Sequence, residues 1–242
     1  MIDTHAHLDA LEDPTGAIER ARAVGVDRIV AIGSGLDSTR ATLELAGGGV
    51  SVAVGIHPHQ AADGETVDDL AALIDGRVVA IGEIGLDFYR DYAPREDQQR
   101  VFAEQLQLAA ELGKAVVVHS RAADEEPAAA LERFDGTVIL HCFSSPGLLP
   151  VALDRGYYVS FAGNVTYPKA GELRAATVQV PPERILAETD CPYLAPQPVR
   201  GKTNEPAYVV HTIASLAETR GEDAEELGRR IDANAAAAFG LS

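Results

Sequence analysis

The chain has 242 residues, of which 46% are hydrophobic, and it carries a formal net charge of -17. This length is close to the roughly 250 residues of a (β/α)8 barrel, so we expect one domain over residues 1–242. The net charge argues against nonspecific binding to DNA or to acidic membranes. No apolar run is long enough to cross a bilayer, no signal peptide opens the chain, and two cysteines do not suggest a disulfide framework. We therefore expect a cytoplasmic protein with no membrane partner.

Eight apolar segments alternate with helical ones along the chain. After a first strand from residue 2, a helix is predicted over 15–25, ending at a glycine. Strands over 28–32, 50–56 and 78–83 are followed by helices over 37–46, 67–74 and 95–112. Strands over 115–119, 137–141 and 157–161 are followed by helices over 124–134, 147–155 and 169–178. A strand over 184–190 and helices over 206–220 and 223–239 complete the chain.

The predicted strands are mostly apolar and do not alternate between apolar and polar residues. Such strands are typical of a parallel sheet that is covered by helices on its faces. The chain also lacks the Gly-x-Gly-x-x-Gly fingerprint that follows a strand in the dinucleotide-binding fold. We therefore predict an α/β protein with a closed (β/α)8 TIM barrel and not an open doubly wound sheet.

Residues that can bind metal ions gather where the predicted strands end. His5 and His7 end the first strand two residues apart, so both side chains can point the same way. Further strands end at or are followed by other such residues, namely His57, His59, Glu83, His119, His141 and Asp190. Active sites of these barrels lie at the carboxyl ends of the strands, so we expect the side chains to meet at one mouth. Histidines and carboxylates in that place predict a metal site.

The size of this set indicates two metal ions. Four histidines and two carboxylates exceed the three protein ligands of a catalytic zinc with an open position, but they suit two divalent cations bridged by a carboxylate. Glu83 comes from the middle strand of the set and is the natural bridge. We expect one ion to be held by His5, His7 and Asp190, and the other by His119 and His141. Zinc, manganese, magnesium and iron all accept such ligands, and Glu188 is expected to orient them or to bind a third ion.

Seven short blocks of sequence occur in order from residue 2 to beyond residue 200. They are Asp3-Thr4-His5-Ala6-His7-Leu8-Asp9, Gly55-Ile56-His57-Pro58-His59, Gly82-Glu83-Ile84-Gly85-Leu86-Asp87, His119-Ser120-Arg121, His141-Cys142-Phe143-Ser144, Glu188-Thr189-Asp190-Cys191-Pro192-Tyr193-Leu194-Ala195-Pro196 and Asn204-Glu205-Pro206. These blocks resemble the signature motifs of the TatD family, metal-dependent hydrolases within the amidohydrolase superfamily, many of them described as deoxyribonucleases. The resemblance implies a TIM barrel of the metal-dependent hydrolase type with a binuclear site, its ligands being His5, His7, Glu83, His119, His141 and Asp190.

Two positions depart from the family pattern. Ala6 stands where a cysteine is common, and Ser145 stands where a glycine is usual after His141-Cys142-Phe143-Ser144. Neither change removes a ligand. Ser145 could reshape the loop after the sixth strand and so alter the preference for substrate.

The resemblance and the ligand set together predict a divalent-metal-dependent deoxyribonuclease that cleaves phosphodiester bonds, as an exonuclease acting on DNA ends. Asp190 and Glu83 are the expected catalytic residues, Asp190 as the acceptor of a proton from the attacking water and Glu83 as the bridge. Arg200 and Lys202 lie in the loop after the eighth strand, a common phosphate site in barrels. Six residues are expected to bind the DNA or nucleotide substrate, namely His57, His59, Arg121, Arg200, Lys202 and Asn204. We expect the protein to be a monomer.

Some assignments leave alternatives open. His57 and His59 could orient the ligands or carry a further ion, and Asn204 could cap the helix that follows it. The same barrel and metals could also hydrolyse an ester or amide in a small molecule, a nucleotide or an aminoacyl-RNA, since one barrel hosts many reactions. A non-catalytic metal-binding protein is a third class, which the complete ligand set disfavours.

Overall fold

The structure is a computed structural model that describes residues 1–90 and 92–241. Within them, eight parallel strands form one sheet, and each strand pairs with its neighbour in sequence. The strands are β1 (Ile2–Ala6), β2 (Arg28–Ser34), β3 (Val50–Gly55), β4 (Val78–Asp87), β5 (Ala115–Arg121), β6 (Val138–Leu140), β7 (Tyr158–Phe161) and β8 (Ile185–Ala187). The domain predicted over residues 1–242 also includes residues 91 and 242, which lie outside the described part of the chain.

The sheet curls into a nearly closed barrel, and its seam lies between β1 and the segment after β8. The amide of Asp190 donates to the carbonyl of His5 at 2.9 Å, and the amide of His7 donates to the carbonyl of Cys191 at 2.9 Å. These bonds continue the parallel pairing across the seam, where Ala6 forms a bridge with Cys191. The predicted TIM barrel is confirmed.

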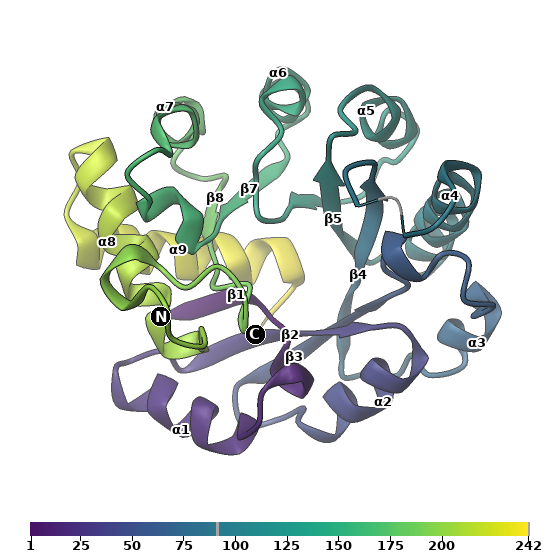
Figure 1. Cartoon of the computed structure of the whole chain (residues 1–242), viewed down its shortest axis with the longest axis horizontal. Helices are drawn as coiled ribbons and strands as arrows, with labels where there is room; N and C mark the ends of the chain where they lie inside the picture. Colours follow the sequence, from purple (N-terminus) through teal and green to yellow (C-terminus); the bar gives the residue numbers. More distant parts are fainter. Residues whose placement is uncertain (91, 242) are drawn as a thin grey trace.

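Helices surround the strands, as Figure 1 shows. They are α1 (Pro14–Ala23), α2 (Leu36–Glu44), α3 (Val67–Ala71), α4 (Arg95–Leu112), α5 (Glu125–Leu131), α6 (Leu149–Arg155), α7 (Gly171–Gln179), α8 (Val209–Arg220) and α9 (Ala224–Phe239). The last helix covers the start of β8, where the side-chain amide of Asn234 donates to the carbonyls of Pro182 and Ile185 at 2.9 and 2.8 Å. None of the helices in the described residues is long and apolar enough to cross a membrane.

Local signals in the sequence set the helix ends. Helix α9 begins where the carboxylate of Asp223 accepts from the amides of Glu225 and Glu226, and it ends at Gly240 with a φ of 63°. Helix α4 likewise ends at Gly113, which has a φ of 62°. Each helix then buries one face against the strands, whose residues are almost all buried. Burial of a single large aliphatic side chain contributes about 1.5–3 kcal/mol, so this shared core stabilises the barrel.

Two strands near the site differ from the prediction. Strand β4 does not end at Glu83 but continues to Asp87, pairing with β5 as far as Arg121. Gly85 permits this, because it has a φ of +138° and a Cβ there would lie 2.0 Å from the carbonyl oxygen of His119. Conversely, β8 ends at Ala187 and not at Asp190, so the last three residues of that predicted strand form an irregular loop.

Candidate metal centre

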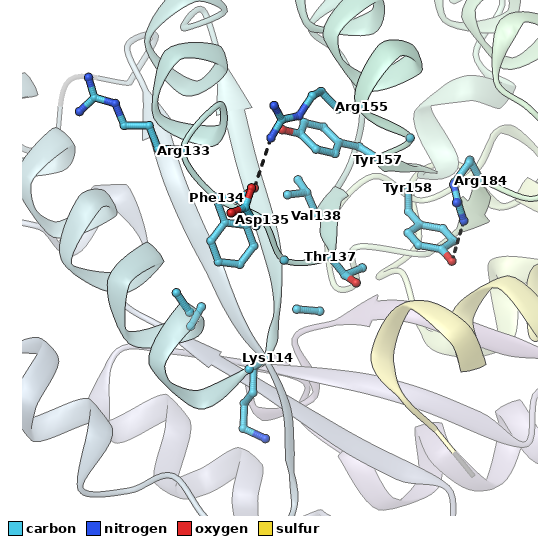
Figure 2. A pocket seen from close by; sticks show the side chains of 16 residues that line it. Lys114, Arg133, Phe134, Asp135, Thr137, Val138, Arg155, Tyr157, Tyr158 and Arg184 are labelled. Carbon is cyan, nitrogen blue, oxygen red and sulfur yellow. Dashed lines mark hydrogen bonds between the residues drawn. The ribbon is translucent and has the colours of Figure 1, made fainter.

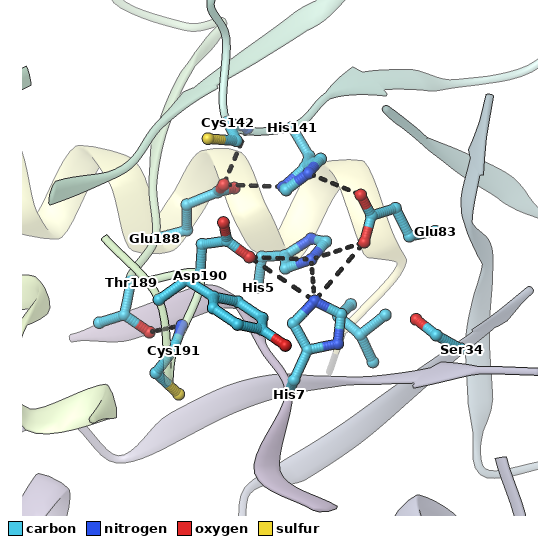
Figure 3. A network of polar contacts seen from close by, with 12 residues as sticks. His5, His7, Ser34, Glu83, His141, Cys142, Glu188, Thr189, Asp190 and Cys191 are labelled. Atoms are coloured by element: carbon cyan, nitrogen blue, oxygen red, sulfur yellow. Dashed lines mark hydrogen bonds and ion pairs between the residues drawn. The ribbon is translucent and has the colours of Figure 1, made fainter. Parts of the chain in front are cut away.

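One side of the site is built by β1 and the loop after β8 (Figure 3). The Nε2 atoms of His5 and His7 lie 3.3 Å apart. Both face the Oε2 atom of Glu83, at 3.4 and 3.5 Å, and the Oδ1 atom of Asp190, at 3.8 and 3.6 Å. His5, His7 and Asp190 each offer a ligand atom within 4.8 Å of the others. This is the first of the two ligand groups that the sequence predicts, and we call it the seam group.

The other oxygen of Glu83 faces a second set of histidines. Its Oε1 atom lies 2.7 Å from Nδ1 of His119, 2.9 Å from Nε2 of His141 and 3.3 Å from Nε2 of His57. His57, Glu83 and His119 form one candidate ligand group, and His5, Glu83 and His141 form another. We call His57, His119 and His141 the inner group. His57 was expected to bind substrate, with an orienting role or a further ion left open as alternatives, and the structure brings it among the candidate ligands.

The backbone at the site departs from ordinary strand geometry. Asp190 has a φ of 56° and Cys142, directly after His141, has a φ of 42°. Residues other than glycine rarely adopt this left-handed conformation, and such strain concentrates at functional sites. Because of it, Asp190 reaches His5 and His7 although β8 has already ended. The prediction that the strand itself runs to residue 190 was wrong.

A buried carboxylate that the sequence analysis did not select clamps the seam. Asp3 is fully buried, and it accepts hydrogen bonds from the amide and the hydroxyl of Thr189 at 2.8 and 2.5 Å. The amide of His5 donates to it at 3.3 Å. Burial raises the pKa of Asp3 to about 8, although the hydrogen bonds from Thr189 oppose that shift. The signal was available, since Asp3 precedes His5 by two residues and so lies on the same side of β1.

Two further carboxylates contact histidines at the site. Glu188 accepts from Nδ1 of His141 at 2.9 Å and from the amide of Cys142 at 2.8 Å, as expected of a residue that orients a ligand. Asp87 lies 2.7 Å from Nε2 of His59 and 3.5 Å from Nε2 of His119. Asp87 is a second residue that was missed, because β4 was predicted to stop before it. His59 thus contacts a carboxylate beside the inner group.

Burial and charge give the histidines different pKa values. Burial and the charge of His141 lower the pKa of His5 to about 3, against the pull of Glu83. Burial also lowers the pKa of His57 to about 4. Burial opposes charge on His7 too, but hydrogen bonds and charges from Asp190 and Glu83 outweigh it and raise its pKa to about 10. Neutral imidazoles are metal ligands, and surroundings that attract a proton to His7 also attract a cation.

The donor set fits divalent cations. Donor atoms that share one ion at about 2.0–2.2 Å are separated by about 3.0–3.6 Å. Two separations in the seam group, 3.3 and 3.6 Å, lie in this range, and the third, 3.8 Å, is slightly longer. Several buried polar atoms at the site also have no hydrogen-bond partner among the described residues, namely Nδ1 of His5, Nε2 of His119 and Oε2 of Glu188. Buried polar atoms are otherwise almost always paired, so these are marks of a functional site.

The remaining predicted substrate residues differ in their availability. The guanidinium groups of Arg121 and Arg200 lie 4.1 and 4.2 Å from the ring centres of Tyr89 and Tyr167. Lys202 is exposed. Asn204 is fully buried, and its amide donates to the carbonyls of Thr189 and Tyr193 at 2.8 and 2.5 Å, so it holds the loop and offers a substrate no exposed atom. It also makes no helix cap.

A cavity of about 640 Å³ lies at the opposite end of the barrel (Figure 2). It is lined by residues that precede strands, including Lys114, Thr137, Tyr157 and Arg184, and its described lining contains no histidine. Two of its cations are engaged by the protein. Lys114 donates to the carbonyl of Val78 at 2.6 Å, and Arg184 donates to the hydroxyl of Tyr158 at 3.0 Å. Size alone therefore does not identify the catalytic site.

Comparison with known proteins gives the family. A family model described as "TatD related DNase" matches residues 2–240. The chain belongs to the TatD family. The uncharacterized metal-dependent hydrolase YabD of Bacillus subtilis is 35% identical over 255 residues, covering all of both chains. The 3'-5' ssDNA/RNA exonuclease TatD of Klebsiella pneumoniae is 37% identical over 261 residues, covering 100% of this chain and 98% of that relative.

Solved structures agree with this membership. The crystal structure of YJJV, a TatD homologue from Escherichia coli K12, matches with a TM-score of 0.91 and 29% identity, covering 100% of this chain and 98% of that one. This TatD-family protein is accordingly a metal-dependent hydrolase, and the candidate ligand groups described above lie where its barrel places an active site.

Proposed function

We propose that this TatD-family protein is a nuclease that hydrolyses phosphodiester bonds at DNA ends. One observation carries the proposal. The carboxylate of Glu83 lies between two sets of histidines, with Oε2 toward the seam group and Oε1 toward the inner group. A carboxylate between two ligand groups suits a site for two metal ions, as used by enzymes that hydrolyse phosphodiester bonds. The name of the Klebsiella pneumoniae relative, an exonuclease for ssDNA and RNA, supports the same substrate class.

In this proposal, His5, His7 and Asp190 would hold one divalent ion, His119 and His141 would hold the other, and Glu83 would be shared between them. His57 lies close enough to Glu83 to join the second set. When bound, the two cations supply Lewis-acid polarisation of the phosphate and an activated water. Asp3 and Glu188 keep the ligands in position through the hydrogen bonds described above, and Asp87 lies beside His119 while it binds His59.

Asp190 is the residue best placed to accept a proton. Its side chain is 14% exposed, whereas that of Glu83 is 3% exposed, so a substrate and its attacking water can reach Asp190 more easily. One of its oxygens, Oδ1, faces His5 and His7, and the second oxygen remains for proton transfer. The proton taken from the water then passes to the leaving oxygen or to solvent.

Two arginines supply positive charge beyond the ligand groups. Arg121 ends β5, and its guanidinium makes no hydrogen bond within residues 1–90 and 92–241, although it rests on the ring of Tyr89. Arg200 follows β8 and donates to the hydroxyl of Tyr167. Arginine forks match phosphate oxygens, and the net charge of -17 acts weakly at this distance because salt screens charges beyond about 8 Å. We assign both to the phosphates of the substrate.

The test is a cleavage assay with the protein loaded with magnesium, manganese, zinc or iron in turn. A 5'-labelled single-stranded DNA is expected to shorten stepwise from its 3' end, with release of mononucleotides. The same metal-loaded protein is offered duplex DNA, RNA, simple phosphodiesters, and small esters and amides. Turnover of the small esters or amides alone would replace the nuclease proposal by the other hydrolase class.

A further inference from the structure

The exposed aromatic residues of this protein are confined to two loops. Tyr89 and Tyr92 are each 64% exposed, and Tyr193 is 59% exposed. The other exposed large apolar side chains in the described residues are aliphatic and belong to helices or their ends, namely Val24, Leu112, Leu153 and Val178. Burial of an aromatic ring is strongly favourable, so exposed rings that gather in one region indicate a ligand.

Tyr92 and Tyr193 stand directly beside histidines of the site. The ring of Tyr193 lies 6.1 Å from that of His7, with an angle of 69° between the planes. The ring of Tyr92 lies 4.8 Å from that of His59, with an angle of 85°. Both contacts are edge-to-face, and within the described residues no parallel ring or arginine covers either tyrosine. A flat ligand can therefore stack on each ring. Tyr89 differs, because the guanidinium of Arg121 already rests on it.

The two tyrosines flank the site from opposite sides. Tyr92 follows β4 and Tyr193 follows β8, and these strands are four places apart in a barrel of eight. Tyr193 accompanies the seam group through His7, whereas Tyr92 adjoins His59, whose ring lies 4.2 Å from that of His57 in the inner group. A phosphate placed over Glu83 would thus have one ring on each side.

We propose that Tyr92 and Tyr193 are stacking platforms for the two unpaired bases on either side of the scissile phosphate. Every nucleobase offers a flat face, so such platforms accept any sequence. In a duplex both faces of each base are covered by neighbouring bases, so the platforms require a single strand. The inference rests on the proposed nuclease function and adds to it the two residues that select a single-stranded substrate.

The test compares two labelled single strands of equal length, one intact and one with abasic residues at its two 3'-terminal positions. Y193A and Y92A are expected to raise KM for the intact strand by about tenfold to a hundredfold, with kcat little changed, because each loses one stacked base. Y193F and Y92F keep the ring and are expected to behave as the wild type. V178A removes an exposed apolar group far from the mouth and serves as the distant control. On the abasic strand, wild type and alanine variants are expected to be alike.

The possible outcomes separate the two proposals. If the alanine variants cleave the intact strand with unchanged KM, the platforms are refuted while the nuclease function stands. The same holds if their KM rises as much on the abasic strand as on the intact strand. If the phenylalanine variants fail as badly as the alanine variants, the hydroxyl and not the ring is in use, and stacking is again refuted. If the wild type cleaves neither strand with any of the four metals, the nuclease function fails and the platforms fail with it.

Discussion

The two ends of the barrel are made from the same eight strands, yet most of the unpartnered buried polar atoms of the described residues lie at one of them. At the base, Lys114 donates to the carbonyl of Val78 and Arg184 donates to the hydroxyl of Tyr158, although Oδ1 of Asp232 is buried without a partner there. At the mouth, Nδ1 of His5, Nε2 of His119 and Oε2 of Glu188 are buried without partners in the described structure. The base has a cavity of about 640 Å³, and the mouth has several buried polar atoms without partners in the described structure.

This difference shows what separates a structural polar group from a functional one. A buried polar atom costs about 1–3 kcal/mol when it is left unpaired, so several such atoms in one place mark a region that the fold alone does not stabilise. The histidines of the mouth also face carboxylates at distances that one cation can span, which the arginines and lysine of the base do not. Satisfaction of polar groups is therefore a better guide to the site here than the volume of a cavity.

The largest expected effect comes from Glu83, which both ligand groups share. Glu83→Gln removes the charge that bridges them and should lower kcat by about a thousandfold or more, while the far-ultraviolet circular dichroism stays native. At the base, Arg184→Ala should leave kcat unchanged. Steady-state kinetics on single-stranded DNA measure both. Near-normal turnover in Glu83→Gln would contradict the proposed role of the mouth.

Removal of metal should affect variants at the two ends of the barrel differently, in stability as well as in activity. A ligand held at a hundred times its Kd stabilises a protein by about 2.7 kcal/mol, which corresponds to about 5 to 10 °C in Tm for a chain of this size. A chelator should therefore abolish turnover and lower Tm by this amount in the wild type and in Arg184→Ala alike. The fall should be much smaller in Glu83→Gln. Equal falls in all three proteins would place the bound metal elsewhere.

Asp3 tests whether the seam must be clamped for the mouth to work. Asp3→Ala leaves the amide of His5 and both donors of Thr189 without their acceptor, so we expect metal affinity to fall by about tenfold to a hundredfold. Asp3→Asn keeps one acceptor oxygen and should recover part of this loss. Calorimetric titration of metal into the apoprotein measures the affinity, and chemical denaturation measures stability separately. A loss of stability with unchanged affinity in both variants would make Asp3 purely structural.

Much of this arrangement could be predicted from the sequence, and the failures have specific causes. The barrel was predicted from eight apolar segments that alternate with helical ones, because this pattern can be recognised from neighbouring residues in the sequence. The convergence of His5, His7, Glu83, His119, His141 and Asp190 followed from the rule that strand ends meet. Asp87 was missed because the fourth strand was predicted to end at Glu83, whereas the positive φ of Gly85 lets β4 continue to Asp87 close beside β5.

Other features depended on tertiary contacts that no local pattern reveals. Asn204 was expected to cap a helix or touch substrate, but it is buried beneath the loop after β8, where it binds two carbonyls. Likewise, the rule that strand ends meet does not tell which oxygen of Glu83 each histidine faces: Nε2 of His57 lies 3.3 Å from Oε1, on the side of His119 and His141. The left-handed backbone at Asp190 is set by its hydrogen bond across the seam to His5, at a distance of 185 residues in the chain.

The smallest expected effect lies at the base, in the hydroxyl of Tyr157. It donates to the carbonyl of Leu131 at 3.2 Å, and burial raises its pKa. Tyr157→Phe should reduce the free energy of unfolding by about 0.5–1.5 kcal/mol at pH 7 and leave kcat unchanged. Because the pKa is raised in the folded state, this contribution is complete below the unfolded value of about 10 and is lost as the pH rises through the folded value. The gap between wild type and variant should therefore narrow in alkaline denaturation experiments. A gap that widens with pH would mean that the hydroxyl is ionised more easily in the folded protein, and the base would then no longer be the satisfied end of the barrel.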